Sequence, residues 1–296
     1  MSGCTLCPRE CGIDRKNSSG ACGAMELPYI ARADLHMWEE PFISGTRGSG
    51  TIFFCGCNLQ CIFCQNHSIS QGIIGHAADA DLIAKTMLKL QEIGANNINL
   101  VTPTPHIDVI VPALQIAKDN GLIIPIVYNT NSYEKVDALR RLEGLIDIYL
   151  PDLKYVSGIT SLKFSGAEDY FEYASKAVLE MQRQCGQLTV DNNGMAVRGI
   201  AIRHLVLPGC IDEARGVLNF IKANLPITTY ISLMGQYVPC YKADNPPLNR
   251  RLLKSEYQRA IDYCCLLGFE NVMIQEQDAS STEYTPDFNG YTVLDY

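Results

Sequence analysis

From residue 78 onward, hydrophobic and polar positions follow two alternating periods along the chain. Apolar residues such as Leu82, Ile83, Met87 and Leu90 recur at helical spacing, and short apolar runs separate such segments. The apolar runs predict strands near 51–54, 97–102, 122–128, 145–150, 199–207, 227–233 and 270–276. The helical spacing predicts helices near 79–94, 106–119, 134–143, 168–184, 211–224 and 254–267.

This alternation indicates an α/β fold with parallel strands and right-handed helical crossovers. The pattern by itself fits both a doubly wound sheet and a barrel. Polar residues follow strand after strand, at 102–106, 128–132 and 151–155, which is typical of a barrel whose active site lies at its C-terminal mouth. We expect a partial (β/α)6 TIM-like barrel over 49–276, a cysteine-rich N-terminal knuckle over 1–48 and a tail over 277–296 that packs on the barrel.

Composition narrows the class of protein. The 296 residues are 47% hydrophobic, and no run of about 18 apolar residues or apolar leader is present, so we expect a cytoplasmic protein without a membrane partner. The net charge of -8 gives no electrostatic footprint for nucleic acid. Thirteen cysteines in such a chain favour metal or redox chemistry over a disulfide framework.

Three of these cysteines, Cys57, Cys61 and Cys64, follow the first barrel strand with C-x3-C-x2-C spacing. Three thiolates on one short loop can face one point and bind a metal cluster. A structural zinc site or an electron-transfer cluster normally has four protein ligands, so three leave one position open for a substrate or cosubstrate. The flanking glycine, asparagine and glutamine residues argue against three buried, unliganded thiols. Cys55 is expected to be a neighbour of the site, because a fourth thiolate would close it.

Four further cysteines, Cys4, Cys7, Cys11 and Cys22, lie in a turn-rich segment that is too short for a core of its own. They are a candidate ligand set for zinc or a second iron-sulfur cluster, and their spacing does not distinguish the two metals. The alternative is a set of reduced, unliganded thiols. Between this segment and the loop, we interpret Glu39 and Glu40 as a solvated, structural acidic pair.

The three-cysteine loop resembles that of the radical S-adenosylmethionine (radical SAM) enzymes, including the aromatic Phe63 before the last cysteine. The segments YLPDLKY, RHLVLPG, ISLMGQYVP and CPRECG are similar to the branch of pyruvate formate-lyase activating enzymes, close to homologues of uncertain substrate. This resemblance covers nearly the whole chain. It implies that Cys57, Cys61 and Cys64 ligate a [4Fe-4S] cluster whose fourth iron binds S-adenosylmethionine.

The same resemblance implies further contacts to the cosubstrate. Asp152 and Lys154 match a D-x-K pair that lines its site, and His204 matches a histidine that contacts its ribose. Asn129 and Thr130 match a D-T pair that binds a monovalent cation together with the first residue of D-x-K, and the replacement of Asp by Asn129 weakens that site. A glycine-glycine-glutamate motif is also absent, and the hydroxyls of Thr102 and Thr104 become candidate acceptors for the amino group.

The function implied is reductive cleavage of S-adenosylmethionine to a 5'-deoxyadenosyl radical that abstracts hydrogen from a substrate. Activation of a glycyl radical enzyme is one candidate, and modification of another protein or of a small molecule is another. A third, from a different class, is a non-catalytic iron-sulfur or electron-transfer module. The chemistry also implies an electron donor such as flavodoxin or ferredoxin.

Overall fold

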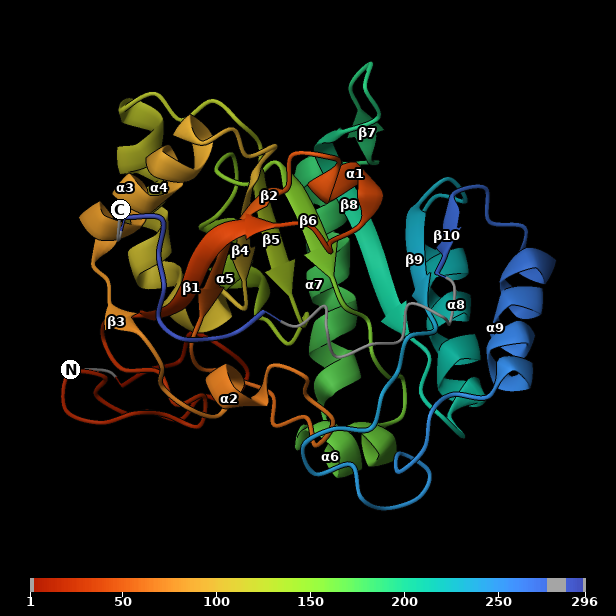
Figure 1. Cartoon of the computed structure of the whole chain (residues 1–296). Coiled ribbons are helices and arrows are strands. Elements are labelled where there is room, and N and C mark those ends of the chain that lie inside the picture. Colours follow the sequence, from red (N-terminus) through yellow and green to blue (C-terminus); the bar gives the residue numbers. More distant parts are fainter. Residues whose placement is uncertain (1–2, 276–285, 295–296) are drawn as a thin grey trace.

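The computed structural model describes residues 3–275 and 286–294, and these residues form one curved sheet covered by helices (Figure 1). The strands are β1 (Tyr29–His36), β2 (Ser49–Phe54), β3 (His76–Ala77), β4 (Ile98–Val101), β5 (Ile126–Thr130), β6 (Ile148–Pro151), β7 (Thr189–Val190), β8 (Ala196–Leu205), β9 (Tyr230–Met234) and β10 (Val272–Ile274). The helices are α1 (Pro41–Ser44), α2 (His67–Ser70), α3 (Ala80–Glu92), α4 (Ile107–Asp119), α5 (Val136–Arg140), α6 (Gly158–Ser165), α7 (Tyr170–Cys185), α8 (Ile211–Asn224) and α9 (Lys254–Leu267), with a 3-10 turn η1 (Thr104–His106).

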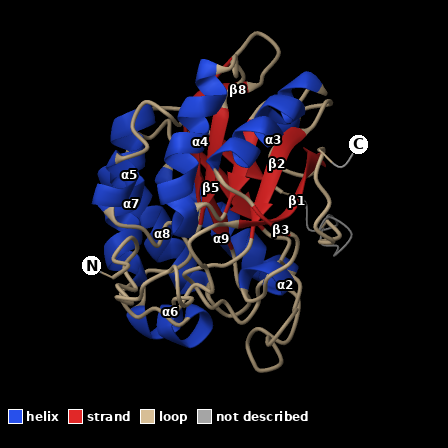
Figure 2. Ribbon diagram, turned by 90° about the vertical axis from the view of Figure 1, so that its left-hand side faces the viewer, coloured by secondary structure: helices blue, strands red, loops and turns tan. Residues whose placement is uncertain are grey.

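The strand order is β10-β9-β8-β6-β5-β4-β2-β1-β3, and every pair from β2 to β10 along this order is parallel. Each predicted strand and helix is present, with ends that differ by a few residues. The α/β fold and the partial barrel are therefore confirmed. Figures 1 and 2 show the long helices on the outer face of the sheet, while the N-terminal segment, α2 and α6 lie together at one end.

Three antiparallel strands extend the predicted set. β1 pairs with β2 and β3, and β7 pairs with β8. The C-terminal residues 290–293 run beside β1, where Ala33 donates to the carbonyl of Tyr291 at 2.9 Å and accepts from Val293 at 3.0 Å. The boundaries proposed at 48 and 276 stay predictions, and residues 276–285 of the proposed tail lie outside the described residues.

The parallel strands present alternate side chains to two different environments. Tyr128, Tyr149, Ile200 and Ile202 face the main hydrophobic core under the helices. Val127, Leu150 and Ala201 face the barrel interior, where Phe42 and Ile43 of α1 fill its N-terminal end. Polar residues at the inward-facing positions nearer the C-terminal ends of these strands therefore lie at the C-terminal mouth of the barrel. No helix among the described residues has the length and apolar character needed to cross a bilayer.

Gly199 makes a close approach between β8 and the chain that precedes it. Its φ is +122°, and a Cβ there would lie 2.3 Å from the carbonyl oxygen of Gln187. Gly194 has a φ of +78° but open space around its Cα.

We expect Gly194→Ala to lower the free energy of unfolding by about 1 kcal/mol, and Gly199→Ala to lower it by about 3 kcal/mol because the clash adds to the strain. Urea denaturation of the two variants measures this difference, and equal losses would contradict the close-approach explanation.

Candidate functional site

The three-cysteine loop leaves the end of β2 and leads to α2. Gly56 makes this exit possible, because its φ is +87° and a Cβ would lie 2.7 Å from the carbonyl oxygen of Cys22. That same carbonyl accepts a hydrogen bond from the backbone N–H of Cys57 at 3.0 Å. The side chains of Cys57, Cys61 and Cys64 line one cavity of about 160 Å³ at the mouth of the barrel. The loop thus brings together the three thiols that the sequence pattern singled out.

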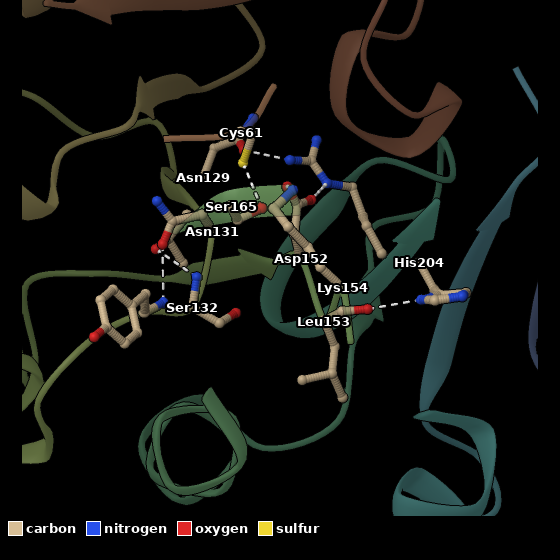
Figure 3. Close-up of polar contacts among 12 residues, drawn as sticks. Cys61, Asn129, Asn131, Ser132, Asp152, Leu153, Lys154, Ser165 and His204 are labelled. Atoms are coloured by element: carbon tan, nitrogen blue, oxygen red, sulfur yellow. Dashed lines mark hydrogen bonds and ion pairs between the residues drawn. The ribbon is translucent and has the colours of Figure 1, made fainter. Parts of the chain in front are cut away.

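Each sulfur in this loop has a polar neighbour from a different element. Asn131 Nδ2 donates to Cys57 Sγ at 3.3 Å, Ser70 Oγ donates to Cys64 Sγ at 3.4 Å, and Cys61 Sγ lies 3.0 Å from Ser165 Oγ. Figure 3 shows the Cys61 and Ser165 pair. Burial raises the pKa of Cys57 to about 12 and that of Cys61 to about 11. Binding of a metal cluster would therefore have to displace protons from these thiols.

These residues fit a [4Fe-4S] cluster. Cysteine sulfurs are the normal ligands of such clusters, and hydrogen bonds to those sulfurs are a normal part of their surroundings. The three thiols surround a cavity, and within residues 3–275 and 286–294 no group of three or more His, Cys, Asp or Glu is arranged to hold a single metal ion. Cys55 stands apart from the set, because its sulfur accepts a hydrogen bond from Ile74 N at 3.3 Å and does not line the cavity.

Asp152 and Lys154 lie against the same cavity and form an ion pair. Lys154 Nζ donates to Asp152 Oδ2 at 2.7 Å, and Arg203 Nε donates to Asp152 Oδ1 at 2.8 Å. Burial alone would raise the pKa of Asp152, but the charges of Arg203 and Lys154 outweigh it and hold that pKa below its usual value. Asp152 is therefore an ionised carboxylate at neutral pH. Lys154 is also charged, since Asp152 and Cys61 together offset the effect of burial on its pKa.

Arg203 and Glu39 belong to the site as well, although the sequence pattern did not assign them to it. Arg203 Nη1 donates to Glu39 Oε2 at 3.3 Å, and Nη2 donates to Asn129 Oδ1 at 2.5 Å. Asn99 also donates to Glu39, at 3.0 Å. Glu40 is buried and Glu39 is largely so, with 3% and 11% of their side chains exposed, in contrast to the solvated pair that the sequence suggested. Burial raises the pKa of both despite the nearby Arg203.

His204 lies on the opposite face of β8 from Arg203. Figure 3 shows it pointing away from Cys61, Asp152 and Lys154. Its Nδ1 is 2.7 Å from the carbonyl oxygen of Leu153, and the side chain is buried. Burial lowers its pKa, so the ring is neutral. His204 lines neither of the two cavities at the mouth, and its predicted ribose contact stays a prediction.

The threonines expected to contact the cosubstrate divide into two groups. Thr102 and Thr130 line the cavity, whereas Thr104 is buried behind it. The hydroxyls of Thr104 and Thr130 both donate to the carboxyl group of Glu134, the former at 3.0 Å, and Tyr128 donates to it at 3.0 Å. Burial raises the pKa of Glu134 to about 7 against these three hydrogen bonds.

A second cavity of about 300 Å³ adjoins the first at Cys61, Cys64, Asn129, Asp152, Lys154 and Arg203. Its remaining wall combines aromatic and polar side chains from distant segments, among them Trp38, Phe53, Tyr237, Gln236 and Glu39. Trp38 stands at its rim with 61% of its surface exposed. This cavity can hold a ligand beside whatever occupies the cysteine-lined one.

The segment that carries the N-terminal cysteines contacts the cysteine loop, where the carbonyl of Cys22 accepts from Cys57 N. Cys7 and Cys22 are buried, and Cys4 and Cys11 are partly exposed. The segment is tied to the barrel by Arg9, which donates to the carbonyls of Asn58 at 2.8 Å and of Gly166 at 2.6 Å. Because no group suited to a single metal ion is found in the described residues, zinc or a second cluster at these cysteines stays a prediction.

The cysteine loop makes a first prediction for this site. We expect Cys57→Ala to lose the iron and the visible absorption of the anaerobically reconstituted protein, because two thiols remain to hold the cluster. Cys55→Ala is the matched control, at a buried cysteine two residues away, and it should keep both. Iron analysis and absorption spectroscopy measure the outcome. Equal iron content in the two variants would refute the assignment of the ligands.

Glu134 makes a second prediction, on stability against pH. Its pKa of about 7 in the folded protein exceeds its ordinary value of 4.5, so unfolding between these values releases a proton. The stability that Glu134 contributes to the folded protein is fully present below pH 4.5 and is lost as the pH rises through 7. We compare the free energy of unfolding of the wild type with that of Glu134→Gln. The wild-type value minus the variant value should fall by about 3 kcal/mol between pH 4.5 and 8. Urea denaturation of both proteins side by side tests this, and a difference that does not change with pH would contradict it.

Comparison with known proteins agrees with this geometry. Residues 51–187 match the Radical SAM superfamily. The uncharacterized protein MJ0674 of Methanocaldococcus jannaschii is 32% identical over 269 residues, which cover 88% of this chain and 73% of that protein. A second protein of that organism, the uncharacterized protein MJ0808, is 23% identical over 279 residues, or 88% of this chain and 78% of that protein.

Among solved structures, Streptococcus suis SuiB bound to the precursor peptide SuiA is similar, with a TM-score of 0.52 and 14% sequence identity. The match covers 81% of this chain and 51% of the SuiB chain, so this chain spans about half the length of SuiB. At this identity the likeness concerns the fold. The superfamily match over the cysteine loop and the strands that surround it, together with the extensive identity to the archaeal relative, shows that the chain belongs to the radical SAM superfamily.

Proposed function

We propose that this chain is a radical SAM enzyme that cleaves S-adenosylmethionine reductively and uses the product radical to abstract a hydrogen atom from a substrate. Membership of the superfamily implies a [4Fe-4S] cluster and S-adenosylmethionine. The observation that carries the proposal is the single cavity shared by Cys57, Cys61, Cys64, Asp152 and Lys154. When bound there, the cluster would supply the electron that splits the sulfonium into methionine and a 5'-deoxyadenosyl radical.

The side chains of the mouth have complementary parts in this function. Three cysteines would hold three irons and leave the fourth for the cosubstrate. The ammonium group of Lys154 offers a charged donor to the carboxylate of a zwitterionic amino acid, and the ionised Asp152 holds that ammonium group in place. Thr102 and Asn129 add neutral polar groups on the same wall. Most of the surface of Asp152 and Lys154 is removed from water, which limits the solvent around the space in which a reactive radical would form.

We further propose that the substrate is a protein, and that the chain belongs to the branch of pyruvate formate-lyase activating enzymes. The sequence segments that resemble this branch support the assignment, and activation of a glycyl radical enzyme is the activity it implies. The adjoining cavity, with the exposed Trp38 at its rim, supports a substrate that reaches in from the surface. SuiB offers a parallel, because a protein with this fold has been solved with a precursor peptide bound.

The reaction is tested with reconstituted protein, S-adenosylmethionine and dithionite under anaerobic conditions. We expect 5'-deoxyadenosine by liquid chromatography and a change in the electron paramagnetic resonance of the reduced cluster when S-adenosylmethionine is added. Asp152→Asn should lower the rate by about tenfold or more, because it removes one charged acceptor. Cys265→Ala, at an exposed cysteine of α9, should leave the rate unchanged.

Two outcomes of this assay separate the candidate functions. Absence of both 5'-deoxyadenosine and a spectral change would show a non-catalytic iron-sulfur module. If the reaction occurs, candidate glycyl radical enzymes from the same genome are added, and a glycyl radical signal on the partner supports the activating role. Cleavage without such a signal on any of them would direct the search to other proteins or to small molecules.

A further inference from the structure

The barrel interior concentrates acidic groups around a single guanidinium. Arg203 has its Nε 2.8 Å from Asp152 Oδ1, its Nη1 3.3 Å from Glu39 Oε2 and 4.0 Å from Glu40 Oε2. The exposed fractions of these four side chains lie between 3% and 19%. A carboxyl group removed from water in this way either takes up a proton or pairs with a nearby cation. Arg203 is the cation that lies within 4.0 Å of all three acids, and it keeps Asp152 ionised.

We propose that Arg203 is a built-in cation that takes the place of the monovalent metal ion expected at Asn129, Thr130 and Asp152. Its Nη2 donates to Asn129 Oδ1 at 2.5 Å and its Nε to Asp152 Oδ1, so one planar guanidinium bridges two of the three residues expected to hold the ion. Two of the side-chain oxygens that would bind the ion, Asn129 Oδ1 and Asp152 Oδ1, already bind Arg203. The expected metal ion does not fit this site.

The remaining oxygens of these residues are engaged as well. The hydroxyl of Thr130 donates to Glu134, and the backbone carbonyl of Thr130 accepts from Asp152 N at 2.8 Å. The carbonyl of Asn129 accepts from Thr102 N at 3.0 Å, and Asp152 Oδ2 accepts from Lys154. A monovalent ion at this place would also be repelled by two cations in a poorly solvated environment. Both the ligands and the charge therefore favour the guanidinium.

With Arg203 in place of a metal ion, the positive charge beside Asp152 no longer depends on an ion from the solvent. A metal ion exchanges with the solvent, whereas the guanidinium is covalently fixed on β8 and stays charged at any physiological pH. Arg203 holds Asp152 in place, and Asp152 in turn holds Lys154 beside Cys61. Arg203 is thus a positioning residue for the D-x-K pair. The binding of S-adenosylmethionine should then be insensitive to the identity of the monovalent cation in solution.

This consequence rests on the proposed function, and its test compares S-adenosylmethionine binding in potassium, sodium and choline chloride at equal ionic strength. We expect the dissociation constant of the reconstituted wild type, from the titrated paramagnetic resonance signal, to vary by less than about fivefold, the lower limit of ordinary coupling between two sites. Weaker binding in choline by more than this factor would overturn the proposal.

Variants test the role of the guanidinium directly. Arg203→Met should weaken binding in choline by about tenfold or more, because Asp152 loses a charged partner. Adding Asn129→Asp to Arg203→Met supplies a second carboxylate, and potassium should then restore binding where choline does not. Arg203→Lys should keep part of the affinity. Wild-type affinity of Arg203→Met in choline, with circular dichroism showing a folded protein, would overturn the positioning role.

A measurement without the cosubstrate keeps this inference separate from the proposed function. The thermal unfolding midpoint of the Arg203→Met, Asn129→Asp protein should rise in potassium relative to choline by more than that of the wild type. A rise in the wild type as large as that in the double variant would count against a built-in cation. If the wild type binds no S-adenosylmethionine, the proposed function fails, and this thermal comparison still decides whether Arg203 replaces the ion.

Discussion

The contact between Arg203 and Asp152 holds the mouth of the barrel together. A carboxylate buried beside other acids is unstable without a cation, and Arg203 provides one while also reaching Glu39 and Asn129. Asp152 can then offer its second oxygen to Lys154, which places an ammonium group near Cys61. The polarity of the mouth therefore depends on a side chain of β8 that contacts three other segments at once.

The cysteine loop is supported in a comparable way by segments from outside its own sequence. Cys22 accepts from the first loop cysteine, Ser165 of α6 contacts Cys61, and Asn131 after β5 donates to Cys57. The backbone of the loop is also bound to α6, because Gln60 N donates to Ser165 O at 3.0 Å. Spacing along the chain selects the three thiols, but these neighbours decide where each sulfur points.

The fold and the cluster loop could be predicted because both are encoded locally. A helical or apolar period is visible in a short window, and three cysteines within eight residues share one loop in any fold. β1 was missed because Arg32 and Asp34 interrupt its apolar pattern, and their positions are explained only by partners such as Asp287 and the C-terminal segment. β1 is antiparallel to both of its neighbours, and antiparallel strands commonly have one solvated face and therefore a mixed pattern.

Some residues of the site were missed or placed differently by the sequence analysis. Their positions depend on which face of a strand each residue occupies and on contacts with residues far away in the sequence. Arg203 and His204 are adjacent in sequence, but successive side chains of a strand point to opposite faces of the sheet. Arg203 therefore points into the barrel interior and His204 into the core under the helices. The interior position follows from Ala201, two residues earlier, which packs among the inward-facing residues. Glu39 could not be distinguished from a solvated acid, because its partners Asn99, Asn129 and Arg203 are 60, 90 and 164 residues away.

The difference between local sequence signals and contacts between distant segments also explains why the chemistry of this protein is easier to infer than its substrate. The groups that would hold the cluster lie within one loop and are recognisable by spacing alone. The second cavity is assembled from Trp38, Phe53, Tyr237 and Pro286, which come from four separate segments. No spacing rule connects such residues, so the cysteine motif does not predict them. Under the proposed function, this wall determines which substrate reaches the radical, and its residues must be found in the structure.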